Sequence, residues 1–300
     1  ITGIKNINID PSVTFSTIAI ESQEITILDN NTFVLAYCDE TNNHISFVVY
    51  DTNGTNLTAT NGNAIDVDTD VLLCFGRTVD VSAFNSTHFV IGYVDNLGDD
   101  ATFAIYNRTG SQIVAPTDVD TSVCPSSIVC GGVSVSAFNS THFVIGWMDT
   151  SYTDNDTTTA IYNITGSLIA GPTDVDTNIG AATPGYELGT STFNSTHYIA
   201  VWYDNSEGDT SFIICSSSNS CGAIADADAT SSGSMATVTT LNSTHSALIW
   251  DDSSSDLNLE VFNQYTSVFA EIIIETSLST ATSTGATIDI TTLNSTDYVM

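Results

Sequence analysis

The chain has 300 residues, of which 35 are Asp or Glu and only 3 are Lys or Arg, so its formal net charge is −32 at pH 7. A surface this acidic cannot neutralise phosphates, which excludes nucleic acid and anionic lipid headgroups as partners. A hydrophobic content of 42% also excludes an intrinsically disordered acidic chain, because such chains lack the apolar residues for a core.

The first twenty residues contain no basic segment followed by an apolar stretch, so they do not predict a signal peptide. No run of about 18 apolar residues occurs further along the chain, and we expect no membrane insertion. The sequence is therefore either cytosolic or a mature secreted chain whose targeting segment has been removed.

Internal repeats determine the predicted fold. A segment containing an Asn-Ser-Thr turn, then His, then an apolar run ending in Trp or Tyr recurs along the chain. Copies occupy residues 28–37 (a weaker one), 84–93, 138–147, 193–202 and 241–250, and another begins at residue 293. The recurrence, about every 50 residues, divides the chain into six units: 11–70, 71–121, 122–177, 178–230, 231–280, and 281–300 together with 1–10.

Each unit is predicted to form four short strands, as the third unit illustrates. Residues 133–138 alternate in polarity, residues 142–148 are apolar, and 158–162 and 167–175 follow after a polar loop and an Asn-Ile-Thr-Gly turn. Such runs are typical of an antiparallel meander. We therefore predict an all-β protein: a β-propeller of about six four-stranded antiparallel blades, with the last blade shared between the N- and C-terminal segments. An array of β-sandwiches is the alternative, but each sandwich needs about seven strands.

The sixth unit supplies only part of a blade. Residues 286–300 provide a first strand and the start of a second, and residues 1–10 resemble a fourth strand. The gap would be filled either by further residues of a longer chain or by a neighbouring copy. Because an open blade exposes unpaired strand edges, the second option predicts self-association into a homopolymer such as a filament or sheath.

The six cysteines point to an oxidising compartment, because an even number of closely spaced cysteines in an Asn-, Ser- and Thr-rich chain is typical of disulfides. Zinc is the rival interpretation, but five residues between the members of a pair is not a usual zinc spacing. The predicted disulfides join Cys124 to Cys130, Cys215 to Cys221, and Cys38 to Cys74. They predict an extracellular or cell-surface location.

Acceptor sequences for N-linked glycans are frequent and cluster at two turns of the repeat. They could arise by chance, since Asn also suits turns, but chance would scatter them. Both turns fall on one rim of a meander, so a glycan-coated rim is predicted. The candidate asparagines are Asn30, Asn53, Asn56, Asn85, Asn107, Asn139, Asn155, Asn163, Asn194, Asn242 and Asn294.

Aspartate pairs close the units on the opposite rim. Two positions apart in a strand, both carboxylates face the same side, and such oxygen-rich groups suit Ca²⁺. A solvated acidic face is the simpler alternative, so Ca²⁺ is a possible cofactor only. The candidate ligands are Asp66, Asp68, Asp118, Asp120, Asp174, Asp176, Asp226 and Asp228.

Two recurring side chains have structural interpretations. His88 and its counterparts follow the Asn-Ser-Thr turn, where they would bond to the turn rather than form a metal ring or act as general bases. Trp147 and its counterparts end the apolar run, where they would pack between blades rather than stack on sugars. No catalytic motif stands out, so no enzymatic activity is predicted.

The strings Phe-Val-x-Gly-Trp/Tyr-x-Asp, Ala-Ile-Tyr-Asn-x-Thr-Gly-Ser and Val-Asp-Thr resemble the propeller-type repeats of large secreted bacterial and archaeal adhesin-like surface proteins. The resemblance covers residues 79–229 well and departs at the first turn, where Asn-Ser-Thr replaces a Gly-rich turn. It implies a glycosylated structural or adhesive surface protein. The alternative is a secreted propeller that binds or processes carbohydrate.

Overall fold

The computed structural model describes residues 20–58, 64–69, 71, 78–95, 100–121, 123, 132–150, 155–180, 188–228, 236–251, 257–263, 271–275, 291–292 and 298–299. Strands, turns and loops make up these ranges. Within them, no helix is long and apolar enough to cross a membrane.

The described strands form five four-stranded antiparallel sheets, which we call blades 1 to 5, and a sixth sheet of two strands. Blade 1 contains β1 (Ile20–Asp29), β2 (Thr32–Asp39), β3 (His44–Asp51) and β4 (Ile65–Asp68). Blade 2 contains β5 (Val79–Asn85), β6 (His88–Asp95), β7 (Asp100–Asn107) and β8 (Gln112–Asp120). Blade 3 contains β9 (Val133–Ala137), β10 (His142–Asp149), β11 (Asp156–Asn163) and β12 (Leu168–Asp176).

Blade 4 contains β13 (Leu188–Asn194), β14 (His197–Asp204), β15 (Asp209–Ser216) and β16 (Ala225–Asp228). Blade 5 contains β17 (Ala236–Asn242), β18 (His245–Asp251), β19 (Leu257–Asn263) and β20 (Glu271–Glu275). The sixth sheet pairs β21 (Thr291–Thr292) with β22 (Tyr298–Val299). Each sheet lies within one of the units defined by the repeats. The predicted contribution of residues 1–10 to the last blade lies outside the described residues.

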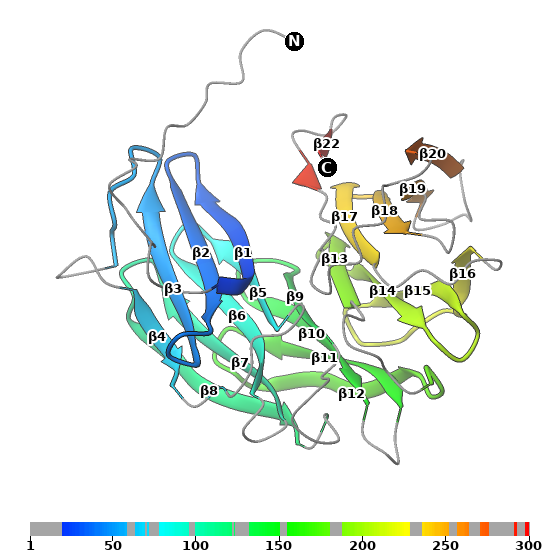
Figure 1. Ribbon diagram of the computed structural model, residues 1–300, viewed down its shortest axis with the longest axis horizontal. Coiled ribbons are helices and arrows are strands. Elements are labelled where there is room, and N and C mark those ends of the chain that lie inside the picture. Colours follow the sequence, from blue (N-terminus) through cyan, green and yellow to red (C-terminus); the bar gives the residue numbers. More distant parts are fainter. Residues whose placement is uncertain are drawn as a thin grey trace, which may run out of the picture.

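The blades follow one another around an arc, with the first strand of each blade innermost (Figure 1). β1 contacts β5, β5 contacts β9, β9 contacts β13, β13 contacts β17, and β17 contacts β21. Within every blade the strands pair in chain order from the inside outward. Sequential meanders arranged radially define a β-propeller, so the predicted fold class is confirmed.

The core consists of apolar layers between successive blades. Four apolar clusters each combine side chains of two neighbouring blades: blades 1 and 2, 2 and 3, 3 and 4, and 4 and 5. The second strand of a blade is covered on both faces, which is why its sequence is an unbroken apolar run rather than an alternation. Trp147, Trp202 and Trp250 are at most 1% exposed. The interpretation of these indoles as packing between blades is therefore confirmed.

Candidate functional site

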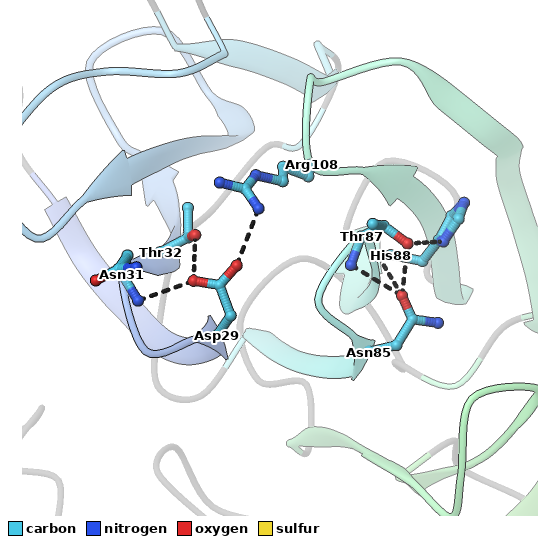
Figure 2. Close-up of polar contacts among 7 residues, drawn as sticks. All are labelled: Asp29, Asn31, Thr32, Asn85, Thr87, His88 and Arg108. Carbon is cyan, nitrogen blue, oxygen red and sulfur yellow. Dashed lines mark hydrogen bonds and ion pairs between the residues drawn. The ribbon is translucent and has the colours of Figure 1, made fainter.

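One rim of the propeller is built from Asn-x-Thr turns. The Asn85 side-chain oxygen accepts hydrogen bonds from the backbone N–H of Thr87 (2.9 Å), from its hydroxyl (2.7 Å) and from the backbone N–H of His88 (3.1 Å). The Thr87 hydroxyl also bonds to Nδ1 of His88 at 2.8 Å (Figure 2). The same bonds recur at Asn139, Asn194 and Asn242. The repeated histidine thus holds the turn, as predicted.

The turns between the third and fourth strands lie on the same rim. The backbone N–H of Arg108 donates to the carbonyl oxygen of Thr87 at 2.8 Å, which joins the two turns of blade 2. The Arg108 guanidinium then reaches blade 1, where it donates to the Asp29 carboxylate at 2.9 Å (Figure 2). The pKa of Asp29 is lowered chiefly by the hydrogen bond from the Thr32 hydroxyl, with Arg108 contributing less.

The predicted glycan acceptors differ in their exposure and in the hydrogen bonds of their side-chain amides. Asn30 and Asn53 are exposed in turns, whereas the amide nitrogen of Asn56 is buried and has no hydrogen-bond partner in the described part of the chain. The amide nitrogen of Asn194 donates to the Ser243 carbonyl oxygen of the next blade at 2.9 Å. Asn155 precedes β11, and Asn294 lies outside the described residues. Glycosylation stays a prediction, and Asn56 is its least suitable acceptor.

The opposite rim holds the aspartate pairs, whose members have different partners. The first aspartate of a pair accepts a hydrogen bond inside its own blade: Thr158 donates to Asp174 at 3.0 Å. The second accepts one from the next blade: Trp202 donates to Asp176 at 3.1 Å. Equivalent bonds are Ser46 to Asp66, Thr102 to Asp118, Tyr93 to Asp68 and Trp147 to Asp120. The pairs of blades 1, 2 and 3 therefore join successive blades, a role that the sequence did not reveal.

The last of these bonds gives a stability prediction. The Trp250 indole nitrogen is buried with no hydrogen-bond partner among the described residues, unlike that of Trp147. Trp147→Phe leaves the Asp120 carboxylate without its donor, so we expect it to destabilise the protein by about 1.5–3 kcal/mol more than Trp250→Phe. Urea denaturation of both variants measures the difference. Equal losses would mean that the bond contributes nothing.

A pocket of about 290 Å³ lies where blades 3 and 4 meet on the acidic rim. It is lined by Asp176, Asn178, Asp204, Ser206, Glu207, Ser211, Ile224 and Asp226. Carboxylate oxygens of Asp204, Glu207 and Asp209 lie within 4.8 Å of one another. Of the predicted metal ligands, Asp176 and Asp226 reach this pocket. Glu207 was missed, because it has no counterpart in the repeats.

Two carboxyl groups at this end of blade 4, those of Asp204 in the pocket and Asp209 beside it, are buried together. Asp204 and Asp209 face each other across β14 and β15, and each is 4% exposed. Burial, helped by the charges of Asp226 and Asp204, raises the pKa of Asp209 to about 6. Burial also raises the pKa of Asp176, and the neighbouring Asp204 raises it further. Such a cluster can bind a cation or accept hydrogen bonds from several hydroxyl groups of one ligand.

Blade 1 has a different residue at the position of Asp209. His44 there takes the place that Asp209 has in blade 4, opposite Asp39 in the strand register. Its Nδ1 lies 3.5 Å from the Asp66 carboxylate. A side chain that can carry positive charge thus occurs where blade 4 has a carboxylate. Blade 4 therefore differs from blade 1 in charge at this position. Ca²⁺ binding by the aspartate pairs stays a prediction.

The raised pKa of Asp209 predicts a pH dependence. Its pKa in the folded chain is about 6, above the value of about 3.9 for an unfolded chain. Folding is therefore favoured most below the unfolded value, and the contribution is lost as the pH rises through about 6. We expect Asp209→Asn to be more stable than the wild type at pH 7.5, with the advantage gone near pH 4. Thermal melts across this range test it, and parallel curves would contradict it.

The sequence matches no protein-family model and no curated protein. The structure is similar to that of the BP39L lectin from Burkholderia pseudomallei, with a TM-score of 0.63 at 11% identity over 86% of this chain and 70% of that chain. AofleA from Arthrobotrys oligospora gives 0.53 at 11% identity over 84% and 72%. Prolyl oligopeptidase B from Galerina marginata gives 0.52 at 11% identity over 88% and 36%. At such identities the likeness establishes the propeller fold alone, and the resemblance to adhesin-like surface proteins stays a prediction.

The disulfide prediction is confirmed for one pair. Cys215 and Cys221 are bonded, and they close the turn between β15 and β16. Cys38 is also in a disulfide. Cys74, Cys124 and Cys130 lie outside the described residues.

Proposed function

We propose that this chain is a secreted carbohydrate-binding propeller whose ligand occupies the acidic pocket between blades 3 and 4. The observation that carries the proposal is the lining of that pocket, where carboxylates from two blades lie beside the Asn178 amide, the Ser206 hydroxyl and the exposed side chain of Ile224. Sugar hydroxyls donate to carboxylates, an amide can donate and accept, and an apolar group can contact the face of a sugar ring.

The charge of the pocket restricts the class of sugar. Four carboxylate side chains line it, and their combined negative charge repels an acidic ligand. The ligand is therefore a neutral saccharide, or a basic one such as an amino sugar, rather than a uronic or sialic acid. The lectin among the similar structures supports carbohydrate binding as a use of this fold. The peptidase with a similar propeller shows why the pocket, and not the fold, must carry the argument.

A glycan array probed with the full chain tests the proposal. We expect binding to neutral or basic glycans and little to acidic ones. Asp226→Asn should weaken binding about 10- to 100-fold, because it removes a charged acceptor at the pocket. Asp118→Asn changes the equivalent aspartate in blade 2, away from the pocket, and should leave binding unchanged. Loss of binding in both variants, or no binding to any glycan, would contradict the proposal.

The filament or sheath role inferred from the repeats is a separate prediction, and so is the absence of enzymatic activity. Electron microscopy of the purified protein distinguishes a filament or sheath from a single binding module. Extended fibres with a repeat the size of one propeller would favour a structural role.

A further inference from the structure

A second cleft lies on the rim of Asn-x-Thr turns, again where blades 3 and 4 meet. Its volume is about 220 Å³. The buried side chains of Phe138 and Ile161 and the exposed side chain of Ile169 form its apolar lining. Its polar lining consists of Asn139, His142, Ser195 and Ser217. None of the lining residues is Asp, Glu, Lys or Arg, so the cleft differs in charge from the acidic pocket on the opposite rim.

One small residue accounts for this cleft. Arg108, Ile164 and Ser217 hold the same position in blades 2, 3 and 4, because each donates its backbone N–H to the Thr carbonyl oxygen of the Asn-x-Thr turn in its own blade at 2.8 Å. The side chain of Arg108 reaches Asp29 of blade 1 (Figure 2). The side chain of Ile164 packs against the apolar cluster between blades 2 and 3. Ser217 is shorter than either, and the cleft lies where it faces blade 3.

The turn determines which nitrogen of His142 can accept a hydrogen bond. The Thr141 hydroxyl donates its one proton to the Asn139 side-chain oxygen at 2.8 Å. Its oxygen must therefore accept from Nδ1 of His142, which lies 2.8 Å away. Nδ1 carries the proton, so Nε2 of the neutral ring has the lone pair. In blade 5 the same arrangement is visible, because Nε2 of His245 lies 3.4 Å from the Asn263 amide nitrogen, a donor. No described residue donates to Nε2 of His142, so the cleft offers an acceptor.

The Asn139 amide supplies a donor to the same cleft. Its oxygen accepts the hydrogen bonds of the turn, which leaves its NH₂ group. The corresponding NH₂ group of Asn194 donates to the Ser243 carbonyl oxygen of blade 5 at 2.9 Å, whereas that of Asn139 donates to no residue in the described part of the chain. The hydroxyls of Ser195 and Ser217 can donate and accept. The cleft thus combines a donor, an acceptor and two hydroxyls with an apolar lining.

We propose that this cleft is a second ligand site, and that it binds a neutral sugar ring. Adjacent hydroxyls of a sugar can donate to Nε2 of His142 and accept from the Asn139 amide, while the C–H face of the ring contacts Ile169. Because the cleft has no carboxylate, it does not favour a basic sugar as the acidic pocket does. The two sites share no residue and lie on opposite rims, so this proposal does not depend on the acidic pocket.

Filling the cleft tests the proposal. In Ser217→Ile the new side chain takes the place that Ile164 has in blade 3, so the turn can accommodate it. The full chain, made in a bacterial host so that Asn139 carries no glycan, is applied to an array of neutral glycans that end in mannose, galactose, N-acetylglucosamine or fucose. We expect Ser217→Ile to bind at least one of them about tenfold more weakly than the wild type, or weaker still. Ser86→Ile is the matched control, because it makes the same change at an exposed position of the blade 2 turn, away from the cleft.

Asp226→Asn separates the cleft from the acidic pocket. Glycans bound in the cleft should keep their affinity in Asp226→Asn and lose it in Ser217→Ile, and glycans bound in the acidic pocket should do the reverse. If Ser217→Ile bound every glycan as strongly as the wild type, this proposal would fall while that for the acidic pocket stood. It would also fall if Ser86→Ile lost the same binding, because the loss would then not come from the cleft.

Nuclear magnetic resonance of the histidine rings gives a check that needs no substitution. The array glycan that Ser217→Ile loses is added to the ¹⁵N-labelled wild type. The Nε2 resonance of His142 should move, because this nitrogen gains a hydrogen bond. That of His88, the counterpart in blade 2, should stay in place, because Ile164 holds the position of Ser217 at the contact between blades 2 and 3. An unchanged His142 resonance, or equal shifts of both rings, would overturn the proposal.

Discussion

Replacing Asn219 with alanine should lower the free energy of unfolding by about 3 kcal/mol, although the residue lies in a short turn. Asn219 is 8% exposed and projects from the Cys215–Cys221 hairpin of blade 4 into blade 3. Its side-chain oxygen accepts from the hydroxyls of Thr159 (3.1 Å) and Tyr198, and its amide donates to the Thr159 carbonyl oxygen at 2.9 Å. Removing the amide leaves the Thr159 hydroxyl without this acceptor and the Thr159 carbonyl oxygen without this donor, whereas the Tyr198 hydroxyl keeps its bond to the Thr159 hydroxyl at 2.8 Å. A buried polar group left without a partner costs about 1–3 kcal/mol.

The backbone supplies the rest of the effect. Asn219 has a φ of 59°, in the left-handed region, which asparagine tolerates better than alanine. In the corresponding turns of blades 2 and 3 this position is glycine, Gly110 and Gly166. Asn219→Gly therefore keeps the backbone and removes only the hydrogen bonds, so we expect it to be less harmful than Asn219→Ala by about 1 kcal/mol.

Urea denaturation monitored by tryptophan fluorescence measures both variants. If Asn219→Gly were as stable as the wild type, the buried hydrogen bonds would carry no net stability. If both variants lost the same amount, the left-handed backbone would cost nothing. Either result would remove one half of the explanation for this turn.

The strands and turns could be predicted because the same sequence pattern recurs along the chain, so that each copy supports the interpretation of the others. Each copy of Asn-Ser-Thr-His forms its turn from its own side chains, as the bonds from Asn85 to Thr87 and His88 show, so local sequence is sufficient there. The apolar run before Trp147 likewise predicted a strand, which the structure shows to be covered on both faces. The fold class follows from counting such units.

The contacts between blades could not be predicted in the same way. The indole of Trp202 in blade 4 donates a hydrogen bond to Asp176 in blade 3. The sequence around neither residue indicates that the two are partners. The pocket beside blade 4 combines shared and unshared residues: Asp209 has counterparts in Asp100 of blade 2 and Asp156 of blade 3, whereas Glu207 belongs to a loop whose sequence differs between the copies. A periodic pattern predicts the carboxylates that the copies share, but it does not predict the loop residue that completes the pocket.

Gly171 is where we expect a single methyl group to be most harmful. Its φ is 88°, which alone costs an L-residue about 1–2 kcal/mol. An added Cβ would also lie 2.8 Å from the Thr159 carbonyl oxygen, 3.1 Å from the Ala160 Cα and 2.7 Å from the Asn219 amide nitrogen. Two of these atoms are backbone and cannot move without disturbing β11. The third belongs to the side chain that joins blade 4 to blade 3.

Gly208 is the matched control, because its φ is 75° but nothing lies within 4 Å of an added Cβ. Gly208→Ala should therefore lose only the conformational part, about 1–2 kcal/mol. Gly171→Ala combines that part with backbone overlap and a displaced Asn219, so we expect it to lose at least about 2 kcal/mol more. In the double variant Gly171→Ala/Asn219→Gly, the loss should be smaller than the sum of the two single losses, since both act on the same contact. Strictly additive losses in urea denaturation would show instead that Gly171 and Asn219 stabilise the contact between blades 3 and 4 independently.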